Sequence, residues 1–378
     1  MTARPGTRRP ARLDIRRLGL LLAAPALAIA FAGVLTTITL LIAGDSPVLA
    51  YTLMLSYATE PDSVVFVINQ GTTYYLSALA VAIGFKMKLF NIGVDGQYRL
   101  AAMLAASVGG AVALPAPLHL LVVVVTAVLV GAFWAGIAGL LKVTRGVSEV
   151  ISTIMLNFIA TGIVSWLLKP GRLAVQIQGS NNIGTRPIPE SGHFPGIPVG
   201  GDTVFGFIVV AIACGIGYHV LVNRTRFGFD LRAAGESETA AVASGVDVRR
   251  MVVTTMLLSG AVAGLVGMPQ LLGGSYTYAL DFPAGLGFTG IAIALLGRNH
   301  AVGVAFGALL WAFLERSSEI LQLYEIPREI VTIMQGTIVL SVVVAYELVR
   351  RYQLVRQRRQ VGEQVGGAPT GEPREATV

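Results

Sequence analysis

Charged residues are scarce in this chain. Asp, Glu, Lys and Arg make up 13% of its 378 residues, whereas soluble domains carry roughly 25%. Hydrophobic residues make up 54%, and the mean hydropathy is +0.70. This composition excludes an ordinary soluble domain. Together with apolar runs of membrane-spanning length, it predicts an all-α integral membrane protein.

The sequence also lacks the residues and motifs of most enzymes. Its single cysteine, Cys214, lies in an apolar run, which excludes a disulfide framework and a cysteine metal cluster. The four histidines are scattered, and HExxH, GxSxG and the phosphate-binding GxxxxGK[ST] are all missing. We therefore expect no catalytic residue, no metal, no cofactor and no ATPase activity of this chain's own.

The apolar runs divide the chain into a basic tail (1–17), a transmembrane domain (18–349) and a disordered basic tail (350–378). The first run is too long for the apolar core of a signal peptide, so we interpret it as a full span. About ten membrane segments are expected, some of them short or broken. Their expected bounds are 18–43, 64–85, 91–114, 118–141, 147–168, 203–222, 251–272, 284–297, 301–314 and 330–348.

Lys and Arg cluster at alternate ends of these segments. Six arginines precede Leu18, and further Lys or Arg residues follow the second, fourth, sixth and last segments. Because short loops rich in Lys and Arg stay in the cytoplasm, both termini are expected there and the loop 169–202 outside. Orientation and contact with anionic membrane lipid explain the net charge of +7. Nucleic-acid binding is not expected.

A long and strongly polar interruption in the middle of the chain is the loop 223–250, with five arginines and four acids. Within it, SETAAVA (237–243) predicts a short helix that begins at a serine and ends before Gly245. A simple connector and a docking element for a soluble partner are both compatible with this pattern.

Polar residues inside membrane segments are costly and therefore point to function. Asp95 and Arg99 are four residues apart and are expected to pair on one helix face. Glu149, Thr153, Asn157 and Thr161 also recur every fourth residue, which predicts a polar stripe. Helix–helix hydrogen bonding is the plain interpretation of this stripe; for Asn157 we favour a position lining a pathway, and we expect Glu149 to be solvated.

The two halves of the chain resemble each other weakly. The glycine-interrupted NIGVDGQ (91–97) has a counterpart in LLGRNHAVG (295–303), and each precedes a helix rich in glycine and alanine. Paired broken segments are typical of transporters built from two related halves. An ion-coupled secondary transporter remains an alternative, because Asp95 and Glu149 could titrate, but it leaves the loop 223–250 without a role.

Four motifs together resemble the permease subunits of ABC importers, and most closely the nucleoside and simple-sugar permeases of the ribose and branched-chain amino acid permease family. They are FNIGVDGQ (90–97), GVSEVISTIMLNFIA (146–160), RFGFDLRAAGESETAAVASGVDV (226–248) and GFTGIAIALLGRNHAVG (287–303). The resemblance covers nearly the whole chain apart from its tails. Asp95 stands where the family usually has Glu, and ESET replaces the usual Asn-Pro, which puts the local turn of the loop in doubt.

The resemblance implies a permease in a bacterial cytoplasmic membrane that imports a nucleoside or, alternatively, a simple sugar. Its implied partners are a second permease, related but not identical, two cytosolic ATPases and an extracytoplasmic solute-binding lipoprotein. Expected pathway residues are Asn91, Asp95, Gln97, Thr153, Asn157 and Asn299. Expected ATPase-coupling residues are Arg232, Ala233, Gly235, Glu236, Ala240, Ala241, Gly245 and Asp247.

Overall fold

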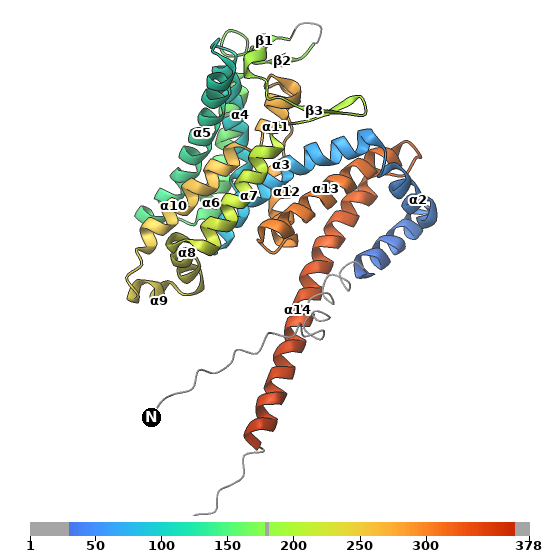
Figure 1. Ribbon diagram of the computed structural model, residues 1–378, viewed down its shortest axis with the longest axis vertical. Helices are drawn as coiled ribbons and strands as arrows, with labels where there is room; N and C mark the ends of the chain where they lie inside the picture. Colours follow the sequence, from blue (N-terminus) through green and yellow to red (C-terminus); the bar gives the residue numbers. More distant parts are fainter. Residues whose placement is uncertain (1–29, 178–180, 367–378) are drawn as a thin grey trace, which may run out of the picture. The chain divides into compact units, whose positions relative to one another are not determined.

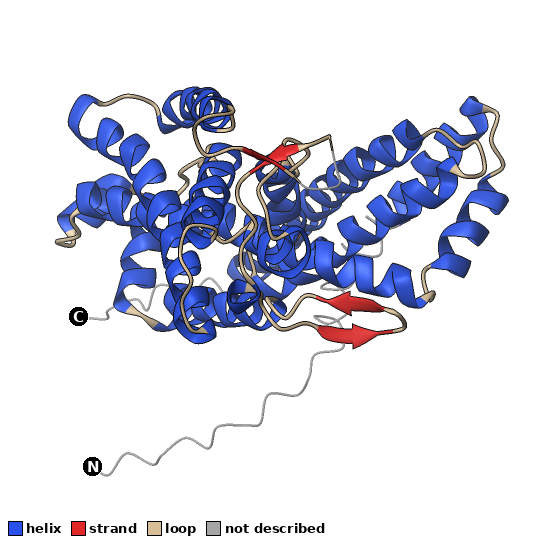
Figure 2. Cartoon of the chain, turned by 90° about the horizontal axis from the view of Figure 1, so that it is seen from above, coloured by secondary structure: helices blue, strands red, loops and turns tan. Residues whose placement is uncertain are grey.

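The computed structural model describes residues 30–177 and 181–366, and helices dominate these residues (Figure 2). The chain divides into two compact units, one made of residues 46–331 and one made of residues 1–45 and 332–378. The elements after the first helix, Ala30–Ala43, are α2 (Pro47–Tyr57), α3 (Pro61–Phe85), α4 (Val94–Gly109), α5 (Ala116–Arg145), α6 (Glu149–Leu167), β1 (Val175–Gln176), β2 (Ile183–Gly184), a 3-10 turn (Glu190–Gly192), β3 (Ile197–Val199), β4 (Asp202–Val204), α7 (Ile208–Arg224), α8 (Arg226–Glu236), α9 (Glu238–Ala243), α10 (Val248–Gly264), α11 (Met268–Gln270), a π-helical turn (Leu271–Ser275), α12 (Leu286–Leu296), α13 (Ala301–Gln322) and α14 (Arg328–Gly366).

The smaller unit contains Ala30–Ala43 and most of α14. The helix α14 continues to Gly366, so the segment 350–366, which we expected to be disordered, is helical. The basic tail 1–17, the start of the first expected span and the last part of the C-terminal tail lie outside the described residues.

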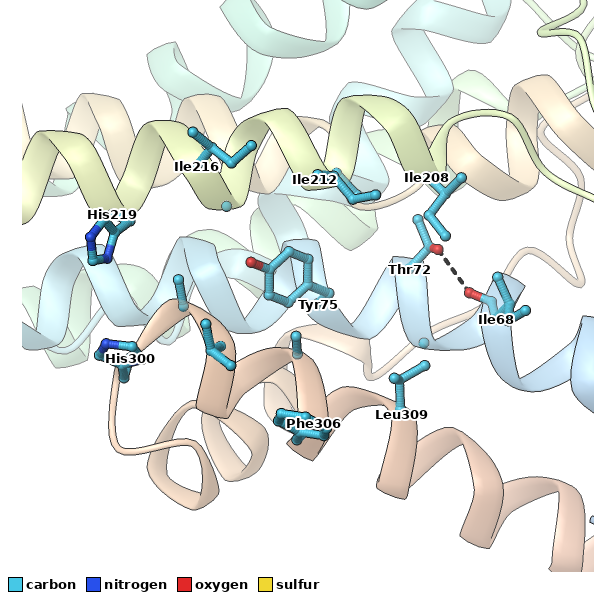
Figure 3. Close-up of a pocket in the computed structure, with 16 residues that line it drawn as sticks. Ile68, Thr72, Tyr75, Ile208, Ile212, Ile216, His219, His300, Phe306 and Leu309 are labelled. Atoms are coloured by element: carbon cyan, nitrogen blue, oxygen red, sulfur yellow. Dashed lines mark hydrogen bonds between the residues drawn. The ribbon is translucent and has the colours of Figure 1, made fainter.

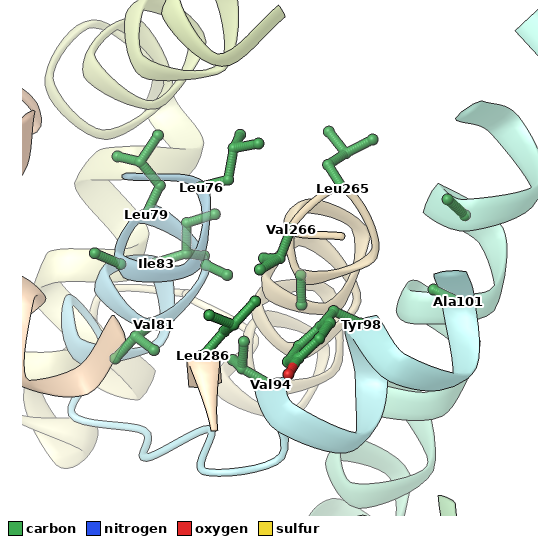
Figure 4. Close-up of a cluster of buried hydrophobic side chains, with 14 of the residues drawn as sticks. Leu76, Leu79, Val81, Ile83, Val94, Tyr98, Ala101, Leu265, Val266 and Leu286 are labelled. Carbon is green, nitrogen blue, oxygen red and sulfur yellow. The ribbon is translucent and has the colours of Figure 1, made fainter. Parts of the chain in front are cut away.

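The core of the larger unit lies where α3, α4, α10 and α12 meet. Leu76 and Leu79 of α3, Tyr98 of α4 and Leu286 of α12 are all buried there, with Val266 just after α10 (Figure 4). The helix α3 is the most enclosed candidate span apart from α10 and its continuation. This enclosure places α3 in the centre of the unit. The segment between α3 and α4 therefore begins at a helix that other helices surround.

The helices α5 and α10 pack closely because glycines line their contact. A Cβ atom added at Gly131 of α5 would clash with the backbone of Gly260 and Gly264 of α10. At Gly139 it would lie 3.0 Å from Cβ of Met256. Gly131, Ala135 and Gly139 recur every fourth residue and form a small-residue packing face on α5, in keeping with the small residues common at membrane helix interfaces.

Non-helical structure gathers at one end of the larger unit, and α8 and α9 lie at the opposite end (Figure 1). The segment between α6 and α7 forms two antiparallel strand pairs, β1–β2 and β3–β4. It packs on the residues after α11, where the amide groups of Thr185 and Phe194 donate to the carbonyls of Tyr278 and Leu272. The expected loop 169–202 is thus a folded layer.

The described residues contain five helices that are long and apolar enough to cross a membrane, or up to seven if two bent pairs each count as one span. The expected segments near α3, α5, α6, α10 and α14 are among them. The helices α4 and α12 have 16 and 11 residues, which is less than a full span. The helix α13 runs past the expected end at residue 314 to Gln322 and includes Glu315 and Arg316. The ten-segment count stays a prediction.

The orientation inferred from Lys and Arg can be tested at two exposed glutamates at opposite ends of the larger unit. We expect cysteines at Glu190 and Glu238, each in a Cys214→Ala background, to react with a membrane-impermeant maleimide from opposite sides of the membrane. Glu190 precedes β3 and Glu238 begins α9, and both are exposed. Labelling of both cysteines from the same side would contradict the topology.

Candidate functional site

The candidate site begins where the chain breaks between α3 and α4. Lys88 has a positive φ of 56°, and the amide of Leu89 donates to the carbonyl of Gly84 at 3.0 Å, so the chain turns back on the end of α3. A Cβ atom at Gly84 would lie 2.9 Å from the Leu89 oxygen. Only glycine leaves room for this close approach.

The segment after this turn is held by a buried network of side-chain amides. The Nδ2 of Asn91 donates to Oε1 of Gln97 at 3.0 Å and to Oγ of Ser259 at 2.8 Å. The Nε2 of Gln97 donates back to Oδ1 of Asn91 at 2.8 Å. Ser259 in turn donates to the carbonyl of Ala80 in α3. Asn91, Gln97 and Ser259 are at most 1% exposed, so the network links α3, α4 and α10 inside the protein.

Asn157 of α6 completes the support of the same segment. Its Oδ1 accepts from the amide of Gly96 at 2.8 Å, and its Nδ2 donates to the carbonyl of Ile92 at 3.0 Å. A Cβ atom at Gly96 would lie 2.8 Å from that Oδ1, so the glycine permits the contact. Asn157 therefore satisfies two backbone groups that the break in the helix leaves without helical partners.

The polar stripe predicted on α6 runs along this segment. Thr153 is buried, and a Cβ atom added at Gly93 would lie 3.0 Å from the Cβ of Thr153. Thr161 accepts from Nη1 of Arg99 at 3.1 Å. Glu149 forms an ion pair with Lys142 and accepts weakly from the amide of Phe90. Glu149 is 7% exposed, so our expectation that it is solvated was wrong.

Asp95 and Arg99 do not form the predicted pair. Among the described residues, no salt bridge includes either of them. Arg99 donates instead to Oγ1 of Thr161, and Oδ1 of Asp95 lies 3.4 Å from the amide nitrogen of Gly287. A Cβ atom at Gly287 would clash with the backbone of Asp95. The start of α12 thus approaches the start of α4 closely, and Asp95 turns toward it.

Asn299, the remaining expected pathway residue, lies at the second break, between α12 and α13. Arg298 and Asn299 both have positive φ, and the amide of Asn299 donates to the carbonyl of Ala294. The carbonyl of Asn299 accepts from the hydroxyl of Tyr218 in α7 at 2.7 Å. At both breaks an amide donates to the carbonyl five residues earlier, which agrees with the resemblance between the two halves of the sequence. The ends of α9 and α13 have the same hydrogen bond, so it is not particular to the breaks.

The expected coupling loop contains two helices, of which the sequence predicted one. Ser237 caps α9 by accepting from the amide of Ala240 at 3.3 Å, which confirms the helix predicted at 237–243. Gly245 has a φ of 84° just after α9, and Asp247 caps α10 by accepting from the amide of Arg250. We did not predict α8 from the sequence. The spacing of Phe227, Leu231 and Ala234 on one helix face indicates this helix, and Leu231 is buried in it.

The surface of this loop differs from our expectation at one alanine. Ala240 is exposed, whereas Ala241 is 2% exposed and packs inside the chain. Both belong to an open hollow of about 500 Å³ between α8 and α9 that Ala233 and Glu236 also line. Phe229, which also lines the hollow, is 64% exposed, and Val242 of α9 is 58% exposed. The loop thus offers a concave surface with apolar side chains at its border.

The helix α8 packs directly against the break after α3. A Cβ atom at Gly235 would lie 2.6 Å from the carbonyl oxygen of Lys86 and 3.0 Å from Cα of Met87. Glu236 and Lys88 are 3.9 Å apart, at exposed positions where an ion pair contributes about 0–1 kcal/mol. Arg232 donates to the carbonyl of Val222 at the end of α7. Close backbone packing therefore joins the loop to the broken segment.

A second hollow, of about 530 Å³, lies at the opposite end of the larger unit, between the start of α3, β4 and α13. Sequence reasoning missed it because its residues come from segments far apart in the chain. Its lining combines polar and aromatic side chains, among them Asn69, Gln70, Gln270, Arg316, Phe66 and Phe205. Asn69 ties the hollow to β4 by donating to Thr203 and accepting from the amide of Phe205.

In the part of the chain that the structure describes, apolar helices of membrane-spanning length, together with polar groups buried around a helix break, define a polytopic membrane protein. Residues 63–343 match the family described as "Branched-chain amino acid transport system / permease component". The chain belongs to this family and is a multi-pass membrane protein.

Curated relatives are transport subunits as well. The chain is 36% identical to the guanosine ABC transporter permease protein NupP of Bacillus subtilis, over 74% of this chain and 81% of the relative. It is 32% identical to the glucose ABC transporter permease protein TsgB13 of Haloferax volcanii, over 82% and 83%. It is 29% identical to the nucleoside ABC transporter permease protein NupB of Lactococcus lactis, over 85% and 90%.

The two bonds of Asn157 generate a stability prediction. We expect Asn157→Leu to lower the midpoint of thermal unfolding, because it leaves the Gly96 amide and the Ile92 carbonyl unpaired at about 1–3 kcal/mol for each buried group. The control is Gly162→Ala on the same helix, where an added Cβ meets nothing within 4 Å. Unchanged unfolding of Asn157→Leu with weakened substrate uptake would instead assign this amide to the pathway.

Proposed function

We propose that the chain is the membrane-spanning permease of an ATP-driven importer in a bacterial cytoplasmic membrane, and that it carries a nucleoside. In the proposed orientation α8 and α9 lie in the cytoplasm, and the layer between α6 and α7 lies outside. Two cytosolic ATPases bind the loop, a solute-binding lipoprotein delivers the substrate from outside, and ATP hydrolysis takes place in the partners.

The observation that carries the proposal is the contact between α8 and the break after α3. Gly235 lies against the backbone of Lys86 and Met87, and a few residues further on Asn91 enters the buried network with Gln97. A force on α8 and α9 therefore reaches the centre of the bundle through packed backbone rather than through flexible side chains. Closing of the ATPases then favours one of two permease conformations by differential contacts.

A second permease is expected on the outward face of α6. The face opposite the polar stripe carries Ile151, Met155, Phe158 and Trp166, which are between 49% and 70% exposed. Lipid or a partner helix must cover such a face in a membrane. We propose a related, non-identical permease, so that α6 separates the subunit contact from the network around Asn91.

The nucleoside is favoured over a sugar by two observations. NupP and NupB are permease proteins for guanosine and nucleosides. The second hollow, between α3, β4 and α13, has amide groups beside aromatic rings. Amides supply hydrogen-bond donors and acceptors for a base or ribose, and aromatic rings suit a flat base. The resemblance to TsgB13 keeps a simple sugar as the second candidate.

The proposed function is tested by transport in proteoliposomes that contain the complete assembly. We expect saturable, ATP-dependent uptake of guanosine, competed by other nucleosides and unaffected by glucose. Competition by glucose alone would replace the nucleoside with a sugar. Uptake driven by a proton or sodium gradient without the ATPases would contradict the ABC permease function.

The coupling role of the loop is tested in the same system. Ala240→Arg adds bulk and charge to an exposed position of the hollow, and Val242→Arg does so at an exposed position of α9. We therefore expect the ATPases to dissociate and uptake to be lost while the permease still inserts and folds. Glu238→Ala is the control, since exposed charges contribute about 0–1 kcal/mol. Ala241→Arg is unsuitable because that side chain is buried. Normal uptake by the two arginine variants would make the loop a simple connector.

A further inference from the structure

An apolar groove lies between α3, α7 and α13, and its lining includes none of the residues of the network around Asn91 (Figure 3). Its volume is about 670 Å³. Ile212 and Ile216 of α7 form one wall and Phe306 of α13 the other; these three side chains are between 53% and 69% exposed. Nothing else in the larger unit covers the walls, so an apolar group from outside this unit is needed to fill the groove.

Small residues create the floor of the groove. Gly71 of α3 lies under Leu309, whose Cδ2 would be 3.0 Å from an added Cβ. Gly215 of α7 contacts the hydroxyl end of Tyr75, and an added Cβ there would clash with it. The two glycines let α3, α7 and α13 enclose a slot without filling it with their own side chains.

One end of the groove is basic. His219 of α7 and His300 before α13 face each other with ring centroids 6.0 Å apart, and both line the groove (Figure 3). Burial, and then the positive charges of Arg232 and Arg298, lower the pKa of Lys86, so these three cations lie near one another. Arg298 precedes His300 by two residues, which brings positive charge close to this end of the groove.

The groove has the length of one acyl chain. Ile208 and His219 are eleven residues apart on α7, which corresponds to about 16 Å at 1.5 Å per residue. Half of the hydrocarbon core of a bilayer measures about 15 Å. The apolar walls thus match the length of one acyl chain, and the two histidines lie at one end of it.

We propose that this groove binds an anionic phospholipid, with one acyl chain between α7 and α13 and the phosphate against His219 and His300. In the proposed orientation the lipid belongs to the cytoplasmic leaflet. Basic pockets between membrane helices on that side suit anionic headgroups. A helix of the partner permease fits less well, because its apolar face would cover the two polar imidazoles and remove them from water.

The lipid is detected by native mass spectrometry of the assembled transporter released from nanodiscs of phosphatidylglycerol and phosphatidylcholine. We expect the wild type to retain phosphatidylglycerol several-fold over phosphatidylcholine. The double variant His219→Ala/His300→Ala should lose this preference but still retain lipid. Ala305→Trp should fill the groove and abolish retention, whereas Leu129→Trp, at an exposed position of α5, should not.

Three results would overturn the proposal. Equal retention of both lipids by the wild type would remove the role of the basic end. Equal effects of Ala305→Trp and Leu129→Trp would show that retention does not depend on the groove. Crosslinking of a cysteine at Ile216, in a Cys214→Ala background, to the partner permease would also overturn it, because a helix would then occupy the groove.

Discussion

The structure depends on one constraint: where a helix breaks inside the protein, every buried backbone polar group must be satisfied by the protein. A buried donor or acceptor that is left without a partner costs about 1–3 kcal/mol. Between α3 and α4 this need is met by side-chain amides. Asn157 bonds the carbonyl of Ile92 and the amide of Gly96, and Asn91 accepts from the amide of Gly93 while bonding Gln97 and Ser259. The break is therefore rigid, and four helices meet around it.

The same break is the point at which the loop helices contact the bundle. Glycines permit other segments to approach the broken segment closely at three places: Gly235 of α8 against Lys86, Gly84 of α3 against Leu89 and Gly287 of α12 against Asp95. Side chains at these positions would separate α8, α3 and α12 from the broken segment. A movement of α8 would therefore bear on the broken segment through the contact of Gly235 with Lys86 and Met87, as the proposed coupling requires.

Much of this arrangement could be predicted from single residues and their spacing. The membrane class, the glycine face of α5 and the short helix α9 follow from composition, from Gly131 and Gly139, and from the Ser237 cap. The partners of polar residues could not be predicted, because they come from distant segments. Asp95 and Arg99 are correctly spaced for a pair, yet Gly287 and Thr161 are nearer partners. Glu149 is polar and near a helix end, yet Lys142 and the amide of Phe90 enclose it.

The central claim, that α8 acts on the bundle through its contact with Lys86 and Met87, is tested most directly by the number of substrate molecules imported per ATP hydrolysed. Gly235→Ala inserts a Cβ 2.6 Å from the Lys86 oxygen, whereas Gly217→Ala on α7 meets nothing within 4 Å. Alanine favours a helix over glycine by about 1 kcal/mol, so α8 itself is not weakened. The account predicts that Gly235→Ala keeps its ATPases and their hydrolysis but imports less per ATP, while Gly217→Ala keeps the wild-type ratio. A wild-type ratio in Gly235→Ala would contradict it.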